Sequence, residues 1–242
     1  VTRSSRGNRD PCEVSESVRL SCEGAEKAAC AFLGPAGARG TAVTHRDFFG
    51  ISPDRRHGIE RVAREFVPGR RVALSTHINA DGDGCGSETG LARLLAQRGL
   101  DVHIVNPTPW PELFDFLLAD DVVDRSADGA QALRDIDLLI VLDISDVRRV
   151  GSLADTVRGL KVPRVVIDHH IASDDHAGDI VLTDTTACAT GELVYDLACE
   201  LGFTISPRIA RSLYSAILTD TGGFRFSNTT PRSHAVAADL LA

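Results

Sequence analysis

Short apolar segments alternate with segments of helical periodicity from residue 58 onward, and this alternation restricts the possible folds more than any other feature. The apolar segments that we interpret as strands are RRVALST, DVHIVN, DLLIVLDIS and RVVIDHH. Helical spacing of apolar residues predicts helices over GIERVAREFVPG, SETGLARLLAQRG, PELFDFLL, GELVYDLACELG and PRIARSLYSAILTD. Apolar strands separated by helices predict an α/β fold with a doubly wound, mainly parallel sheet that carries helices on both faces.

Histidines and aspartates gather where these predicted strands and helices end. The residues are His77, Asp81 and Asp83 in the glycine-rich stretch HINADGDGCG, Asp143 at the end of LLIVLD, Asp168, His169 and His170 at the end of RVVIDHH, and Asp220 at the end of the last helix. We expect HINADGDGCG itself to be a loop. The carboxyl ends of parallel strands meet at one edge of a sheet, where open α/β proteins bind their ligands. The sequence therefore predicts a single site at that edge.

Four of the five aspartates in this set would repel one another and raise their pKa values, unless cations neutralise them. They are Asp81, Asp83, Asp143 and Asp220. Two divalent ions would balance the four charges. Carboxylate and imidazole ligands without thiolates favour Mn²⁺ and leave Mg²⁺ and Co²⁺ as alternatives. Two metals roughly 3.5 to 4 Å apart can activate a shared water for attack on phosphorus, so we expect a metal-dependent phosphoesterase.

Four stretches of the chain resemble, in order, the motifs of the DHH family of phosphoesterases. They are HINADGDGCGSE, with Ala80 where proline is commoner, LLIVLDISD, VVIDHH and LYSAILTDTGGFRFSNTTPRSH. The resemblance extends from about residue 57 to the end of the chain and implies a RecJ-like N-terminal domain. Within the family, the long fourth motif and the GS ending of the first are most similar to bacterial nanoRNases that also act as pAp phosphatases.

The resemblance also implies roles for individual residues. One metal would be held by His77, Asp81 and Asp143, and the other by Asp83, Asp143, His169 and Asp220, so Asp143 would bridge the two metals. His170 would contact the scissile phosphate or protonate the leaving oxygen. Asp168 would orient a neighbouring histidine.

The implied substrates are short oligoribonucleotides, pAp or both. A cyclic-dinucleotide phosphodiesterase and an inorganic pyrophosphatase, both known in the same family, stay open as alternatives. A nucleotide-binding module without catalysis is a further alternative, although a complete set of ligands argues against it.

The charge and hydropathy of the chain restrict its partners. Its net charge is −8, and no basic stripe is present to neutralise the phosphates of long duplex nucleic acid. No apolar run approaches the roughly 20 residues of a membrane span, and the first thirty residues lack the features of a signal peptide. We therefore expect a cytoplasmic protein that acts on small nucleotide phosphates, and we leave open whether it forms a homodimer.

The domain organisation that we predict has two parts. Residues 1–57 lack a sustained apolar period and are interpreted as a poorly structured tail, linker or non-native extension. Residues 58–242 form the DHH phosphoesterase domain. Members of the family normally continue into a smaller C-terminal domain that grips the substrate, so we expect that the chain is truncated at Ala242.

Several other polar and aromatic residues have simpler interpretations. The six cysteines are expected to be reduced structural thiols, and a zinc site made of Cys12, Cys22 and Cys30 is disfavoured because no histidine lies close to them. Ser87 is left out of the site because an ordinary helix N-cap explains it as well as anion binding does. Packing is favoured over base stacking for Trp110.

Overall fold

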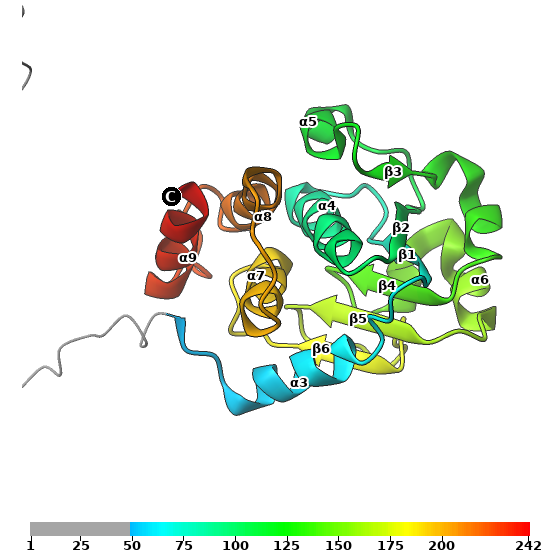
Figure 1. The fold of residues 1–242 in the computed structure, drawn as a ribbon, viewed down its shortest axis with the longest axis horizontal. Coiled ribbons are helices and arrows are strands. Elements are labelled where there is room, and N and C mark those ends of the chain that lie inside the picture. Colours follow the sequence, from blue (N-terminus) through cyan, green and yellow to red (C-terminus); the bar gives the residue numbers. More distant parts are fainter. Residues whose placement is uncertain (1–48) are drawn as a thin grey trace, which may run out of the picture. The chain divides into compact units, whose positions relative to one another are not determined.

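The computed structural model describes residues 49–242 (Figure 1). Its strands are β1 (Arg71–Ser75), β2 (Asp101–Ile104), β3 (Val123–Asp124), β4 (Leu138–Leu142), β5 (Arg164–Asp168) and β6 (Ile180–Thr183). Its α-helices are α3 (Pro53–Ala63), α4 (Gly82–Gln97), α5 (Asp115–Leu118), α6 (Ala154–Gly159), α7 (Thr190–Glu200), α8 (Pro207–Asp220) and α9 (Pro231–Leu241). Three 3₁₀ segments complete it: η1 (Glu112–Phe114), η2 (Ser126–Leu133) and η3 (Val147–Leu153).

The six strands form one sheet in the order β3-β2-β1-β4-β5-β6, and every neighbouring pair is parallel. From β1 the chain moves outward through β2 and β3, and it then returns to β4 on the other side of β1. The strand order thus reverses between β1 and β4, which is where such sheets leave a crevice at their carboxyl ends. The predicted doubly wound α/β fold is confirmed.

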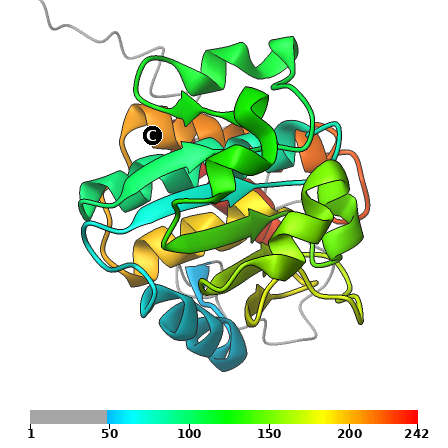
Figure 2. The same cartoon turned by 90° about the vertical axis from the view of Figure 1, so that its right-hand side faces the viewer.

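Side chains from the central strands enter two separate cores because successive residues of a strand point to opposite faces. In β4, Leu138, Ile140 and Leu142 join the core beneath α4 and α7, whereas Leu139 and Val141 join the core beneath η2, η3 and α6. Figure 1 shows α4 and α7 on one face of the sheet, with α8 and α9 further out, and α6 on the other face. Figure 2 looks at the sheet from the α6 side.

The second half of the glycine-rich stretch after β1 is helical, so the prediction of a loop is right for residues 77–81 and wrong for residues 82–86. Helix α4 begins at Gly82, and Asp81 caps it by accepting hydrogen bonds from the backbone N–H groups of Asp83 and Gly84. Two of its glycines approach α8 closely: a Cβ on Gly86 would collide with the Ser212 carbonyl oxygen, and one on Gly90 would lie 2.7 Å from Leu213 Cδ2. Each glycine lowers intrinsic helix stability by about 1 kcal/mol, but the close approach of two helices requires them here.

The ends and edges of the domain also differ from the sequence-based expectation. Helix α3 begins at Pro53 rather than at residue 58, because Ser52 caps it and proline is favoured in the first turn. The edge strands β3 and β6 were not predicted, since they are only two and four residues long. PELFDFLL forms η1 followed by the single turn α5. The predicted zinc candidates Cys12, Cys22 and Cys30, and most of the predicted extension, lie outside the described residues.

None of the helices within residues 49–242 is long and apolar enough to cross a membrane. The thiols of Cys85, Cys188 and Cys199 in this range are free. Trp110 packs beside the small cluster of Ala80, Cys85 and Leu117, as its packing interpretation requires.

A buried ion network ties α3 to α7 and α9. The Arg55 guanidinium contacts Asp184 at 2.7 Å, Glu192 at 2.9 Å and Asp196 at 2.6 Å. Arg232, from α9, also pairs with Glu192, at 3.0 Å, and with Asp196. Glu192 and Asp196 are buried, so each depends on these two guanidinium groups for compensation.

We expect Arg55→Met to lower the free energy of unfolding by about 3–5 kcal/mol, because it leaves buried carboxylates with too little positive charge. The neighbouring substitution Arg56→Met is the matched control. Arg56 pairs with Glu200 at 2.9 Å, but its side chain is 51% exposed, so the loss should stay below about 1 kcal/mol. Urea denaturation followed by circular dichroism measures both losses, and equal losses would contradict the proposed role of the network.

Candidate metal centre

The candidate residues project from the carboxyl ends of β1, β4 and β5, which are neighbours at the centre of the sheet. His77 follows β1, Asp143 follows β4, and Asp168 ends β5 directly before His169 and His170. The N-terminus of α4 supplies Asp81 and Asp83, and the last residue of α8 supplies Asp220. Helix α4 packs against α8, and this contact brings residues of distant sequence to the crevice between β1 and β4.

One group of possible ligands consists of His77, Asp81 and Asp143. His77 Nε2 lies 3.4 Å from Asp143 Oδ2 and 3.7 Å from Asp81 Oδ2. The other ring nitrogen, Nδ1, lies 2.9 Å from the Ile78 carbonyl oxygen. A carbonyl oxygen can only accept, so Nδ1 carries a proton and Nε2 is the nitrogen turned toward the carboxylates.

A second group consists of Asp83, His169 and Asp220. His169 Nε2 lies 3.6 Å from an oxygen of Asp83, 3.6 Å from one of Asp220 and 3.5 Å from Asp143 Oδ1. This Nε2 atom is buried without a hydrogen-bond partner, while Nδ1 lies 3.4 Å from the Ala187 carbonyl oxygen. A buried ring nitrogen surrounded by three carboxylates at these distances fits a divalent cation between them.

Asp143 faces both groups, with Oδ2 toward His77 and Oδ1 toward His169. The chain turns sharply here, since Asp143 adopts a φ of 64°, which costs a residue other than glycine about 1 kcal/mol or more. Its backbone N–H donates to the Ile167 carbonyl at 3.0 Å and continues the pairing with β5. The tight turn is what directs this carboxylate between the two histidines.

The N-terminus of α7 holds two buried carboxylates of the cluster, those of Asp83 and Asp143. The backbone N–H groups of Thr190 and Gly191 donate to Asp83 at 2.7 and 2.9 Å, and the Thr190 hydroxyl donates to Asp143 at 3.1 Å. Ser87 Oγ donates to Asp83 at 3.1 Å from the second turn of α4, so Ser87 is not an N-cap. The sequence analysis missed these roles. It predicted a loop over residues 77–86, so the i, i+4 spacing of Asp83 and Ser87 within α4 was not recognised, and Thr190 lies far from Asp83 in the sequence.

The pair Asp168 and His170 lies at the edge of this cluster. The Asp168 carboxylate accepts from the His170 backbone N–H at 3.1 Å and from the ring nitrogen Nδ1 at 2.8 Å. Asp168 is fully buried, whereas the His170 side chain is 44% exposed. Because Nδ1 is engaged by Asp168, Nε2 remains as the nitrogen available to a bound molecule. His170 Nδ1 is also 3.7 Å from Asp143 Oδ1.

The charges in the cluster shift one another's pKa values. Burial and the charge of Asp143 raise the pKa of Asp83 well above its usual range. Burial alone would lower the pKa of each imidazole, but Asp143 and Asp81 raise that of His77 to about 10, and Asp143 and Asp83 raise that of His169 to about 9. Burial opposes ionisation of Asp143, yet the nearby imidazoles of His169 and His77 hold its pKa well below the ordinary value. Without metal, imidazolium protons therefore supply the positive charge.

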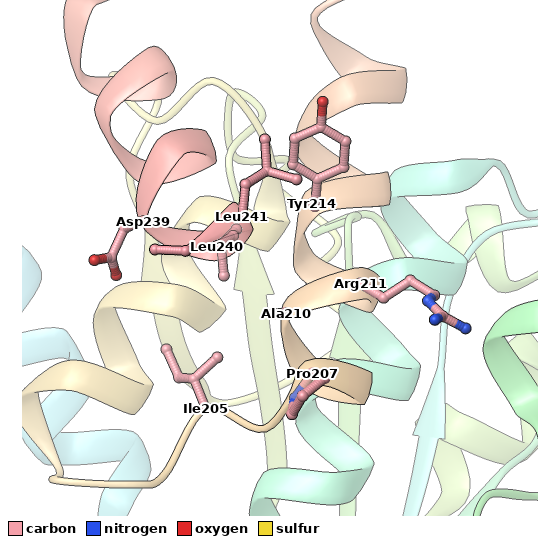
Figure 3. Close-up of a pocket in the computed structure, with 9 residues that line it drawn as sticks. Ile205, Pro207, Ala210, Arg211, Tyr214, Asp239, Leu240 and Leu241 are labelled. Carbon is pink, nitrogen blue, oxygen red and sulfur yellow. The ribbon is translucent and has the colours of Figure 1, made fainter. Parts of the chain in front are cut away.

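A cavity of about 560 Å³ lies apart from this cluster, between α8 and α9 (Figure 3). It is lined by Ile205, Tyr214, Leu240 and their neighbours, and it shares no residue with the cluster. The chemistry of the domain is therefore expected at the acidic edge of the sheet.

We expect metal binding to release protons from His77 and His169, since a ligating Nε2 must be deprotonated. Their raised pKa values imply protonated rings at pH 7, so apparent metal affinity should rise by about 10-fold per pH unit for each proton displaced. Calorimetric titration with Mn²⁺ between pH 6.5 and 8.5, in buffers of different ionisation enthalpy, counts the protons. The His77→Gln variant should release fewer protons than the parent protein. The control variant His57→Gln, at an exposed position, should release the same number as the parent. A metal affinity that does not change with pH would contradict the assignment of His77 and His169 as metal ligands.

Comparison with known proteins agrees with this geometry. The sequence pattern of the DHH family, N-terminal domain, matches residues 71–217. The bifunctional oligoribonuclease and PAP phosphatase NrnA of Thermus thermophilus is 34% identical over 171 residues, which cover 70% of this chain and 49% of that protein. This chain thus spans about half the length of that relative.

Two solved structures share the fold. An exopolyphosphatase-related protein from Bacteroides fragilis superposes with a TM-score of 0.70 at 24% identity, over 77% of this chain and 56% of that chain. The exonuclease RecJ bound to manganese gives a TM-score of 0.51 at 17% identity, over 80% of this chain and 48% of that chain.

Proposed function

Because this chain belongs to the DHH family, we propose that it is a metal-dependent hydrolase of phosphoester bonds in short oligoribonucleotides and pAp. The observation that carries the proposal is that three carboxylates converge on the Nε2 atom of His169, which is buried and has no hydrogen-bond partner. Asp143 is one of the three, and it also faces His77. The relative named an oligoribonuclease and PAP phosphatase supports this choice of substrate.

We assign the two groups of ligands to two divalent ions, and manganese is the ion that we favour. His77, Asp81 and Asp143 would hold one ion, and Asp83, Asp143, His169 and Asp220 the other. Oxygen and imidazole donors without thiolate fit Mn²⁺, and the manganese-bound RecJ structure of the same fold supports it. The chemistry supplied by such ions is Lewis-acid polarisation of water and of phosphate oxygens.

The residues of the chain provide the remaining steps. Asp143 would keep the two metal positions at a fixed separation, because its two oxygens point to different histidines. His170 is the proton donor that we assign to the leaving oxygen, because it is partly exposed and its Nε2 is free of the contact with Asp168. Asp168 fixes the ring orientation and the position of the Nδ1 proton.

We expect Mn²⁺-dependent hydrolysis of bis(p-nitrophenyl) phosphate, and a loss of about 10³-fold in Asp143→Asn, because one shared ligand serves both metals. Asp155 is exposed, so the Asp155→Asn variant is the control, and it should retain the activity of the parent protein. Hydrolysis that survives in Asp143→Asn, or that does not require a metal, would contradict the proposed function.

The leaving group tests the role of His170. In a dinucleotide the departing ribose oxygen needs a proton, so His170→Ala should lower kcat by about 10²–10⁴-fold. With bis(p-nitrophenyl) phosphate the nitrophenolate leaves without one, so the loss should be at least tenfold smaller. Equal losses with both substrates would assign His170 to phosphate binding instead of proton transfer.

A panel of substrates separates the proposed function from the alternatives within the family. The parent protein is assayed with a diribonucleotide, pAp, cyclic di-AMP and pyrophosphate at equal concentrations. Turnover of the diribonucleotide or pAp supports the proposal, whereas pyrophosphate or cyclic di-AMP as the one good substrate contradicts it.

A further inference from the structure

We propose that Asn228, in the segment between α8 and α9, is a positioning residue that holds the Asp220 carboxylate for the metal at the Asp83, His169 and Asp220 position. This inference rests on the proposed function, because it assigns a role toward the metals invoked there. Asn228 Nδ2 lies 3.0 Å from Asp220 Oδ2, 3.1 Å from the Asp220 carbonyl oxygen and 2.8 Å from the Cys188 carbonyl oxygen. The amide therefore joins the end of α8 to the segment that leads into α7.

Asp220 needs such a donor more than the other carboxylates of the cluster. It is the last residue of α8, where helix carbonyls point outward and the negative end of the helix dipole disfavours an anion. Asp83, in contrast, receives two backbone N–H groups at the positive end of α7. Within residues 49–242, the one hydrogen bond donated to the Asp220 carboxylate comes from Asn228.

The position of Asn228 is itself fixed on both sides. On the α7 side, the Asn228 amide donates to the Cys188 carbonyl. The Cys188 backbone N–H donates to Glu192 at 3.1 Å, and Glu192 is held by Arg55 and Arg232. On the α8 side, Gly222 and Gly223 have φ values of 59° and 68°, which let the chain reverse immediately after Asp220. On the α9 side, Thr230 caps the helix and begins a reciprocal capping box with Ser233.

The same short segment, residues 188–191, thus positions both carboxylates that flank His169. Thr190 and Gly191 bind Asp83 directly, and Cys188 binds Asp220 through the Asn228 amide. Loss of the amide frees Asp220 and leaves Asp83, His77 and Asp81 in place. The effect should fall on one of the two metal positions.

The test is a titration of the full chain with Mn²⁺ alone, followed by electron paramagnetic resonance and calorimetry. In Asn228→Ala one of the two sites should weaken by about 10- to 100-fold while the other stays within twofold of the parent. The Asn228→Ser variant, whose shorter side chain also loses the contact with Asp220, should show the same weakening of one site. It replaces the alanine variant in this test if the alanine variant does not fold. Asp220→Asn identifies the affected site, and combining it with Asn228→Ala should add no further loss.

Thr230→Ala is the matched control, because it removes the cap of α9 in the same segment without touching Asp220. It should lower the thermal midpoint and leave both Mn²⁺ affinities unchanged. Parental affinities in both Asn228 variants would overturn the proposal, and so would an equal weakening of both sites or the same loss in Thr230→Ala.

The proposed function and this inference can fail separately. A parent protein that binds two Mn²⁺ ions but hydrolyses none of the phosphoesters refutes the function and leaves the Asn228 result valid. A parent that binds no Mn²⁺ overturns both.

Discussion

Repulsion among the carboxylates at the carboxyl edge of the sheet is the constraint around which this domain is organised. Asp83 and Asp143 are almost completely buried, and Asp81 and Asp220 lie close enough to raise the cost of their charge. Folding such a cluster requires compensation from positive charge or from hydrogen-bond donors. The donors come from the start of α7, and the positive charge from His77 and His169 in the metal-free protein. The sheet, α4, α7 and α8 must all be correctly placed for this compensation to exist.

The packing of α4 against α8 is the structural condition for that compensation. Two aspartates enter the cluster from the first turn of α4, and Asp220 enters it from the last turn of α8. The helices approach so closely at Gly86 and Gly90 that side chains there would collide with α8. The glycines weaken the helix locally, yet they bring its charged first turn within reach of Asp220. The glycine-rich stretch that was predicted to be a loop therefore provides, from Gly82 onward, a helix surface that packs against α8.

The central strands and the identities of the candidate ligands could be predicted from the sequence because both depend on local pattern. Runs such as LLIVL are long enough to identify a buried strand, and an acidic residue directly after one lies at the ligand-binding edge of a parallel sheet. The start of α4 could not be predicted this way, since glycine disfavours a helix and only contact with α8 explains it. Thr190 and Asn228 could not be assigned either, because each acts through a partner in another element. Ser87 was missed because its partner Asp83 lies one turn away only when α4 begins at Gly82. Arg55 is similar: its local sequence, PDRRHG, is that of an exposed turn, and its burial depends on Glu192 and Asp196.

The two proposed metal positions differ in how firmly the protein holds their ligands. Around His169, Asp83 accepts three hydrogen bonds from α4 and α7, and Asp220 is tied to residue 188 through Asn228. Around His77, the Asp81 side chain is 52% exposed; its Oδ1 accepts hydrogen bonds from the first turn of α4, and its Oδ2 lies 3.7 Å from His77 Nε2. Ordered ligands lose little entropy when a cation binds, whereas an exposed carboxylate must be immobilised first. The proposed position at His169 is therefore the one whose ligands the protein holds more firmly.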